Sequence, residues 1–249
     1  SYGLTAAKNW DMDVNATATY TLFETDPSTM IVRKSTDFVG EWTNNVSLGE
    51  SAKLVAGALY NYNKGYSTVT GNVTSDVDRG SFALYSQLDY WVIKSLKVIG
   101  GFQANKVDGV DLKVVPRGGV VWYPVSKLNV KALYGQAFRA PTIYETSVNS
   151  PFLAGNPDLK PESVTSIDFG VNYQGSKFQV GVNYFRNEQT NIISSNRLPS
   201  DTRSVYRNQG EITFEGVELE GNYYILSNLF FMGSALYQEN VNDKDVWST

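Results

Sequence analysis

The segment KFQVGVNY, residues 177–184, decides the fold, because its side chains alternate strictly between two kinds. The apolar set is Phe178, Val180, Val182 and Tyr184, and the polar or small set is Lys177, Gln179, Gly181 and Asn183. Successive side chains of a β-strand point to opposite faces of a sheet. The segment therefore predicts a strand with one apolar face and one polar face.

The same alternation recurs along nearly the whole chain, whereas the 3.6-residue period of an amphipathic helix does not. We expect about eleven strands, and they cover residues 10–24, 31–46, 52–63, 79–92, 96–106, 111–123, 128–138, 163–173, 177–190, 207–225 and 229–240. Residues 2–6 alternate too and could end a twelfth strand. These strands exceed the five to six residues usual in globular sheets and match the roughly 9 to 11 needed for a tilted membrane crossing.

Composition narrows the class of protein. Aromatic residues make up 13% of the chain, and charged residues only 18%, against about 25% in typical soluble domains. No run of about 20 apolar residues suggests a membrane helix, so any membrane contact is expected through strands. Cysteine and histidine are absent, which excludes disulfides and thiolate sites and disfavours most hydrolase mechanisms. A net charge of −4 without a basic run disfavours nucleic acid as a partner.

The connections between the expected strands alternate in length. Short ones fall at 48–50, 94–95, 124–127, 174–176 and 226–228, and longer ones fall at 25–30, 64–78, 106–110, 139–162 and 191–206. Short periplasmic turns that alternate with longer extracellular loops are typical of outer-membrane barrels. Aromatic residues near the strand ends predict two interfacial girdles. They are Trp10, Trp42, Trp91, Trp122 and Tyr123 beside the short turns, and Tyr60, Tyr62, Tyr184 and Tyr237 near the other ends.

These patterns predict an all-β fold, an antiparallel transmembrane β-barrel segment of about 11 to 12 strands. A soluble β-sandwich is the alternative, but it would bury the polar strand faces at about 1 to 3 kcal/mol for each unpaired group. An odd number of strands would begin at one membrane face and end at the other, whereas bacterial single-chain barrels close with an even number. We therefore expect residues 1–249 to be an excerpt of a larger barrel.

Three runs resemble, in order and spacing, the barrel signatures of the TonB-dependent outer-membrane receptors. They are PRGGVVWYPVSKLNVKALYGQAFRAPTIYE (116–145), GNPDLKPE (155–162) and YRNQGEITFEGVELEGNY (206–223). The signature positions are Phe138, Arg139, Ala140, Pro141, Asn156, Pro157, Leu159, Pro161, Glu162, Gly216 and Glu218. The resemblance covers about residues 110–240, and the first hundred residues agree only in pattern.

The resemblance implies a 22-stranded monomeric barrel in the bacterial outer membrane, filled by an N-terminal plug domain. It also implies uptake of an iron–siderophore or similar metal chelate, with cobalamin or haem as variants, energised by the TonB complex through the plug. Residues 1–249 would then be a partial barrel domain, without plug, first strands or last strands. No enzymatic activity and no cofactor are expected. A passive porin or an adhesin is the alternative function, and an enzymatic barrel is disfavoured because histidine is absent.

Candidate ligand contacts lie in the long loops. Arg139 could donate to an anionic ligand or to the plug with its forked guanidinium, or it could tie the loop base to neighbouring strands, which we favour. Asn156, Asp158 and Glu162 are interpreted as turn chemistry. Aromatic and cationic loop residues suit an anionic, aromatic iron chelate. The ligand-binding candidates are Arg139, Tyr144, Phe152, Arg197, Arg203, Tyr206 and Arg207.

Two weaker hypotheses concern charged residues. Asp76, Asp78, Asp108 and Asp111 could hold calcium, but solvated acidic loops are the simpler interpretation, and no metal site is predicted. Charges expected on the polar strand faces could pair with the plug. They are Glu41, Lys131, Lys177, Glu215, Glu218 and Glu220.

Overall fold

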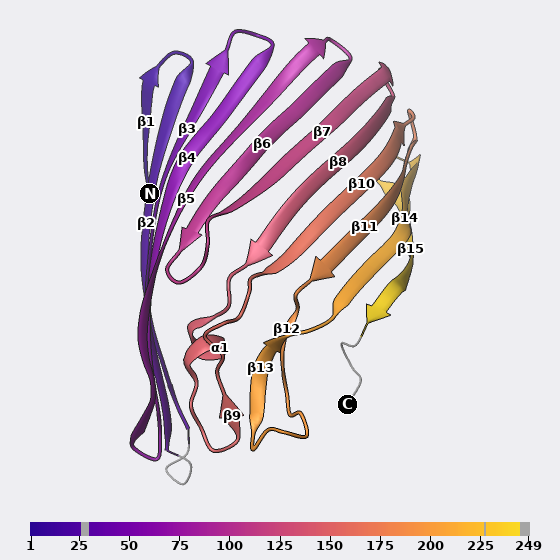
Figure 1. The fold of residues 1–249 in the computed structure, drawn as a ribbon. Coiled ribbons are helices and arrows are strands. Elements are labelled where there is room, and N and C mark those ends of the chain that lie inside the picture. Colours follow the sequence, from indigo (N-terminus) through magenta and orange to yellow (C-terminus); the bar gives the residue numbers. More distant parts are fainter. Residues whose placement is uncertain (26–29, 227, 245–249) are drawn as a thin grey trace.

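Twelve antiparallel strands in chain order form one curved sheet (Figure 1). The structure is a computed structural model, and it describes residues 1–25, 30–226 and 228–244. The strands are β1 (Tyr2–Ala7), β2 (Trp10–Glu24), β3 (Ile31–Leu48), β4 (Ala52–Val69), β5 (Asn72–Ile93), β6 (Leu96–Val107), β7 (Lys113–Val125), β8 (Leu128–Arg139), β10 (Glu162–Gln174), β11 (Phe178–Thr190), β14 (Glu211–Leu226) and β15 (Leu229–Lys244). The predicted all-β, antiparallel barrel wall is confirmed. In the described residues it does not close, since β1 and β15 are its two edges.

The loops contribute a short helix and a second small sheet. Helix α1 (Ile143–Ser147) and strand β9 (Leu153–Ala154) lie between β8 and β10, and β12 (Ile193–Asn196) and β13 (Ser204–Asn208) lie between β11 and β14. The small sheet has the order β12-β13-β9. Within the described ranges, no helix has the length and apolar content needed to cross a membrane.

The cross-strand register sorts the side chains onto two faces. Phe169, Tyr184, Val217 and Tyr237 are neighbours across β10, β11, β14 and β15 and form an apolar rank. The opposite face carries the polar rank Gly170, Asn183 and Glu218. We call these the outer and inner faces. Helix α1 lies on the inner side, because Ile143 Cγ2 is 3.7 Å from where a Cβ on Gly65 would lie.

The apolar band on the outer face has the height of a membrane core. On β4 the outer-facing run extends from Ala52 to Tyr62, about 33 Å at roughly 3.3 Å per residue. A strand tilt of about 40° reduces this to a height of about 25 Å, as in outer-membrane barrels. The next rank on this face is Thr36, Lys64 and Asp78. The face therefore changes from apolar to charged within two residues.

Most of the expected girdle residues lie on the outer face, with two exceptions. Trp122 pairs with Val130 in the outer set, and Trp10, Trp42 and Tyr60 also have outer positions. Trp91 pairs with Lys97 on the inner face, and its ring stacks on Tyr123 with centroids 6.1 Å apart. The girdle prediction is therefore wrong for Trp91 and Tyr123, because each is one position beyond an outward aromatic residue and so points inward.

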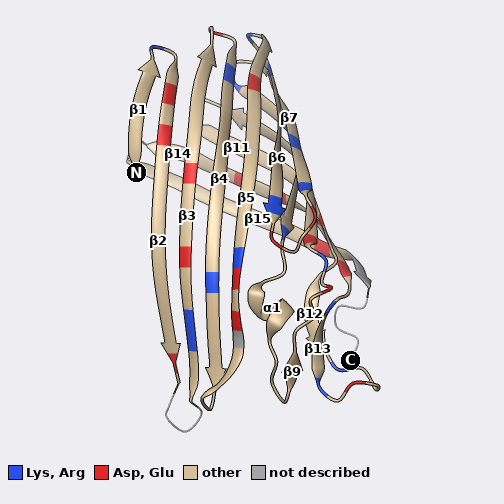
Figure 2. Ribbon diagram, turned by 60° about the vertical axis from the view of Figure 1, so that its left-hand side comes forward, with Lys and Arg blue, Asp and Glu red and all other residues tan. Residues whose placement is uncertain are grey.

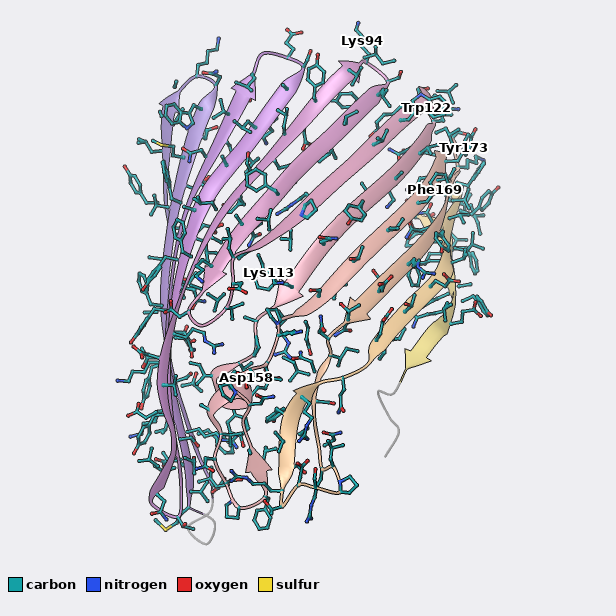
Figure 3. All side chains as sticks on the ribbon, viewed as in Figure 1. Lys94, Lys113, Trp122, Asp158, Phe169 and Tyr173 are labelled. Atoms are coloured by element: carbon teal, nitrogen blue, oxygen red, sulfur yellow. The ribbon has the colours of Figure 1, made fainter. Side chains whose placement is uncertain are left out.

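Short turns gather at one end of the sheet and long loops at the other (Figure 1). We call these the turn end and the loop end. Figure 3 shows Lys94, Trp122 and Tyr173 at the turn end, and Asp158 beside α1 at the loop end. The predicted alternation of connection lengths is confirmed, apart from the segment between β4 and β5. Residues 26–29 of the connection expected at 25–30, and residue 227 of the one expected at 226–228, lie outside the described residues.

The expected loop at 64–78 is instead the loop-end part of the β4–β5 hairpin. Strand β4 continues to Val69 and β5 starts at Asn72, so only Thr70 and Gly71 form the turn. Both have positive φ, 49° and 81°, as two-residue hairpin turns require. The sequence predicts a loop here because beyond the apolar band both strand faces are polar, and the alternation that marks a strand is lost.

Three further expectations need correction at the strand ends and faces. The strand expected from residue 207 begins at Glu211, because Gly210 has a φ of 85° and interrupts the extended backbone. Lys177 lies in the turn before β11 rather than in a strand. Glu215 shares the outer face with Val217, two residues on, so it does not face the lumen. Glu41, Lys131, Glu218 and Glu220 keep the inner positions predicted for them.

Candidate ligand-binding mouth

The two long loops at the loop end are joined to each other. Strands β9 and β13 pair in parallel, with Ser204 opposite Leu153 and Val205 opposite Ala154. The Lys160 amide donates to Asn208 Oδ1 at 2.7 Å, and Asn208 Nδ2 donates back to the Lys160 carbonyl at 2.8 Å. The loops after β8 and after β11 therefore form one unit, which we call the mouth, although about 50 residues separate these partners in the chain.

The GNPDLKPE run contributes to this junction through local turn chemistry at Asn156 and Asp158, as expected from the sequence. The turn interpretation is wrong for Glu162, which begins β10 and accepts from residues distant in the chain. Asn156 Oδ1 accepts from the Asp158 amide at 2.9 Å, and Asn156 Nδ2 donates to the Tyr206 carbonyl at 3.1 Å. Leu159 is buried. A Cβ on Gly155 would lie 2.6 Å from the Thr146 carbonyl carbon, which explains why glycine is required there.

Arg139 ties the base of the mouth together. Its Nε donates to Glu162 Oε2 at 2.7 Å, and Nη1 and Nη2 donate to the Glu145 carboxylate at 2.9 and 3.1 Å. Glu162 Oε1 accepts in turn from the Ile193 amide at 2.7 Å. One guanidinium thus connects β8, α1, β10 and β12. The geometry matches the structural interpretation of Arg139, since carboxylates occupy all three of its nitrogens.

The two carboxylates are held in their charged form. Burial alone would raise the pKa of Glu145, but hydrogen bonds from Arg139 and the Thr142 amide outweigh it and lower that pKa. The pKa of Glu162 is lowered against its burial by Arg139 and the Ile193 amide. The Glu162 hydrogen bond and then the Glu145 hydrogen bonds raise the pKa of Arg139. Thr142 and Glu145 also form a capping box at the start of α1.

The other cations expected at the mouth bind loop residues. Arg203 joins the two loops, whereas Arg197 and Arg207 make contacts within the loop after β11. Arg203 Nη1 donates to Asn149 Oδ1 at 2.8 Å, and Arg207 Nη2 lies 2.9 Å from Asp201 Oδ2. Arg197 Nε donates to the Asp201 carbonyl at 3.3 Å. Phe152 is 83% exposed at the loop tip. Of these four candidates, Phe152 and Arg197 are exposed, whereas Arg203 and Arg207 are half-buried.

A cation and two aromatic rings meet on the inner side of the mouth. Arg33 Cζ lies 5.0 Å from the centre of the Tyr144 ring, and the Tyr144 and Tyr206 rings meet edge to face at 6.4 Å. Burial raises the pKa of Tyr206. Tyr144 and Tyr206 were candidates from the sequence, but Arg33 was missed. It lies on β3, more than 100 residues away, and its only signal is a cation on the inner face above the apolar band.

A cavity of about 550 Å³ lies between this cluster and the sheet. We call residues 140–147, which cross from β8 to β5 and include α1, the strap. Arg79 of β5 donates to the Pro141 carbonyl and, at 3.4 Å, to Thr146 Oγ1. In Figure 2, Lys and Arg positions of β3–β5 lie beside α1. The cavity is lined by Arg33, Lys34, Asn61, Asn63, Gly65, Tyr66, Ser67, Arg79, Ser81, Val107, Ala140, Pro141, Thr142, Ile143 and Tyr144.

The acidic loop residues do not gather into a metal site in the part of the chain that the structure describes. Asp108 Oδ2 accepts from the Gly80 amide at 2.8 Å, and Asp78 accepts from the Tyr62 hydroxyl at 2.9 Å. The geometry thus offers no support for the calcium hypothesis.

The inner face presents polar groups to the lumen. Glu41 accepts from the Tyr85 hydroxyl at 2.8 Å. The side-chain oxygens Asn183 Oδ1 and Asn222 Oδ1 are buried without a hydrogen-bond partner among the described residues. On the outer face, Glu215 pairs with Arg186 at 2.8 Å.

Several solved structures share the fold. A mutant of the ferric enterobactin receptor PfeA from Pseudomonas aeruginosa superposes with a TM-score of 0.76 at 18% identity, over 92% of this chain and 40% of that one. The siderophore receptor PirA from P. aeruginosa gives a TM-score of 0.70 at 15% identity, over 96% and 53%. The copper transporter OprC gives 0.73 at 16% identity, over 94% and 44%.

Curated relatives are similar over parts of the chain. The Heme/hemopexin utilization protein C of Haemophilus influenzae (strain 86-028NP) is 29% identical over 142 residues, 45% of this chain and 20% of the relative. The Ferric enterobactin receptor of P. aeruginosa is 28% identical over 93 residues, 31% of this chain and 12% of the relative. The matched part is thus a fifth or less of either relative. A family model described as "TonB dependent receptor-like, beta-barrel" matches residues 1–248. The chain therefore belongs to the TonB-dependent receptors, a family of transport receptors of the bacterial outer membrane.

Proposed function

We propose that this chain forms part of the wall and extracellular mouth of an outer-membrane receptor that imports an iron–siderophore complex or a similar metal chelate. The observation that carries the proposal is the mouth itself. Two loops are locked together there and place Tyr144 and Tyr206 beside Arg33 on the inner face. Aromatic faces next to a cation suit an anionic, aromatic chelate.

This role also implies partners for the wall, namely a plug, the TonB complex and membrane lipid. Residues 1–249 act as a partial barrel domain around a plug, and the plug passes energy from the TonB complex to the ligand site. The polar inner face, which carries Lys131, Glu218 and Glu220, supports a plug inside the barrel, since charged side chains need polar partners or water. The apolar outer face contacts lipid, the barrel works as a monomer in the bacterial outer membrane, and the protein is a transporter without enzymatic activity.

Haem is the second candidate ligand. It is favoured by the relative whose name is Heme/hemopexin utilization protein C. Haem iron is commonly held by histidine, with tyrosine in some proteins, and this chain contains no histidine. This wall could offer haem only tyrosine phenolates and methionine thioethers as iron ligands. Recognition of a chelate that keeps its own metal donors needs only the cation and the rings, so we favour a siderophore.

The proposal is tested by iron-limited growth of the source bacterium. We expect one ferric siderophore to support growth only when both this gene and TonB are intact. Growth on haemin alone would select the second candidate. Purified protein in planar bilayers distinguishes the porin alternative, because a plugged receptor conducts little. An open, ungated conductance together with growth that does not need TonB would refute the proposal.

A further inference from the structure

The cavity behind the strap has two walls of different chemistry. Its volume of about 550 Å³ falls in the range of about 300 to 1,000 Å³ typical of small-molecule sites. The wall made by β3–β5 is polar and carries Asn61 and Asn63 of β4. The wall made by the strap carries Ile143 and the ring of Tyr144. A planar group with one polar edge would contact both walls favourably.

The cations at this cavity lack a carboxylate partner among the described residues, as do Arg197 and Arg203 at the loop tips, whereas three other arginines have one. Arg139, Arg186 and Arg207 each lie within 2.9 Å of a carboxylate oxygen. Arg33 and Arg79 form no such ion pair with the residues that the structure describes. Arg79 donates to a carbonyl and a hydroxyl, both neutral, and Arg33 lies over the Tyr144 ring.

The charge of Arg79 is only partly compensated. Burial lowers its pKa, and the more distant Asp108 and Glu145 oppose this through space. A half-buried guanidinium without a contacting anion is unfavourable. An anion in the cavity would relieve this cost at Arg79. It would also gain charge-assisted hydrogen bonds, which are stronger than neutral ones.

We propose that this cavity binds an oxyanion carried on an aromatic ring, a carboxylate or a phenolate, between the guanidiniums of Arg33 and Arg79 and the ring of Tyr144. The inference deepens the proposed function and rests on it for biological meaning, since the bound group would belong to the imported chelate. Binding itself requires only the cavity. It can therefore be measured whether or not uptake occurs.

Salicylate and its neutral amide, salicylamide, are matched probes of nearly equal size. We expect the complete protein in detergent to bind salicylate at least about tenfold more tightly than salicylamide in a calorimetric titration, as one charge-assisted hydrogen bond allows. Inorganic phosphate should bind more weakly than salicylate because it cannot contact the Tyr144 ring. Equal affinity for salicylate and salicylamide would overturn the proposal, and so would phosphate binding as tight as that of salicylate.

Variants locate the site. Arg33→Gln should weaken salicylate binding about tenfold, and Arg33→Lys should weaken it less because the charge remains. Lys64→Ala is the matched control, since Lys64 follows Asn63 on β4 but points to the opposite face and lines no part of the cavity. An Arg33→Gln protein that folds and binds salicylate like the wild type refutes the assignment. Salicylate binding without chelate uptake would support this inference while refuting the proposed function.

Discussion

The barrel wall and the mouth are built by different means. In the wall, each strand repeats the same two-residue pattern, and the ranks of the outer face are interchangeable apolar residues such as Phe169 and Val217. In the mouth, single side chains hold specific partners, as Arg139 and Asn208 do. A wall needs only the right class of residue at each position. A mouth depends on particular atoms, so its residues tolerate replacement less well.

The largest expected effect tests the two faces of the wall. Val182 lies in the middle of the outer band on β11 and is 44% exposed. We expect Val182→Arg to cost about 2 to 4 kcal/mol of unfolding free energy, as for arginine near the bilayer midplane. Urea unfolding of the complete protein in lipid vesicles measures this cost.

The control is on the same strand and the other face. Gln179 points inward, three residues before Val182. Gln179→Arg should cost less than about 1 kcal/mol, because the lumen side is polar and hydrated. Equal costs for the two arginine variants would show that the outer face does not contact lipid.

The difference between wall and mouth also explains which features the sequence could predict. The faces and spans of the wall follow from period-two alternation, and the alternation at residues 178–184 is the one observed in β11, although Lys177 belongs to the preceding turn. The alternation fails where both faces meet water, so the β4–β5 hairpin was mistaken for a loop. It also cannot show Arg33 beside Tyr144 or Arg79 bound to the strap, because these contacts depend on how the strap crosses the sheet.

The mouth can be tested at Gly155, where the two loops leave no room for a side chain. A methyl group there would lie 2.6 Å from Thr146 and 2.7 Å from Ser147 backbone atoms. We expect Gly155→Ala to cost about 1 to 3 kcal/mol, the usual effect of overpacking. The loss should be local, and hydrogen exchange should report faster opening of α1 and β9 while the wall stays protected.

Gly135→Ala is the matched control for this glycine. Gly135 lies on β8, and a Cβ there has no atom within 4 Å. Its hydrogen exchange and unfolding should stay within about 0.5 kcal/mol of the wild type. A Gly155→Ala protein with unchanged exchange in α1 would show that the loops yield more easily than the structure indicates.

Arg139 provides a test of the mouth that depends on pH. Because the folded-state pKa values of Glu145 and Glu162 lie below the usual 4.5, the folded state binds fewer protons there than the unfolded state. Their contribution is fully present above about pH 5 and is lost as the pH falls through the lowered values. We expect Arg139→Ala to open the loops by about 1 to 2 kcal/mol at pH 7, measured by hydrogen exchange.

The same variant should show a smaller defect in acid. As the pH falls through the lowered pKa values of Glu145 and Glu162, these carboxylates become protonated in the wild type, and the arginine loses its charged partners. Arg139→Lys is the conservative variant, and it should keep part of the stability because an ammonium can still contact one carboxylate. If the Arg139→Ala defect did not shrink as the pH was lowered until Glu145 and Glu162 had titrated, the ion pairs would not be its cause.

The smallest effect is expected where the wall meets the mouth. Arg186 and Glu215 pair at 2.8 Å on the outer face, one rank beyond Tyr184, with side chains 35% and 26% exposed. Exposed ion pairs contribute about 0 to 1 kcal/mol, so Glu215→Gln should change urea unfolding by less than that. A loss of several kcal/mol would instead mean that lipid, not water, surrounds this pair, because burial in an apolar medium makes an unpaired charge costly. The apolar band would then extend beyond Tyr184, and the boundary between wall and mouth would lie one rank closer to the loops.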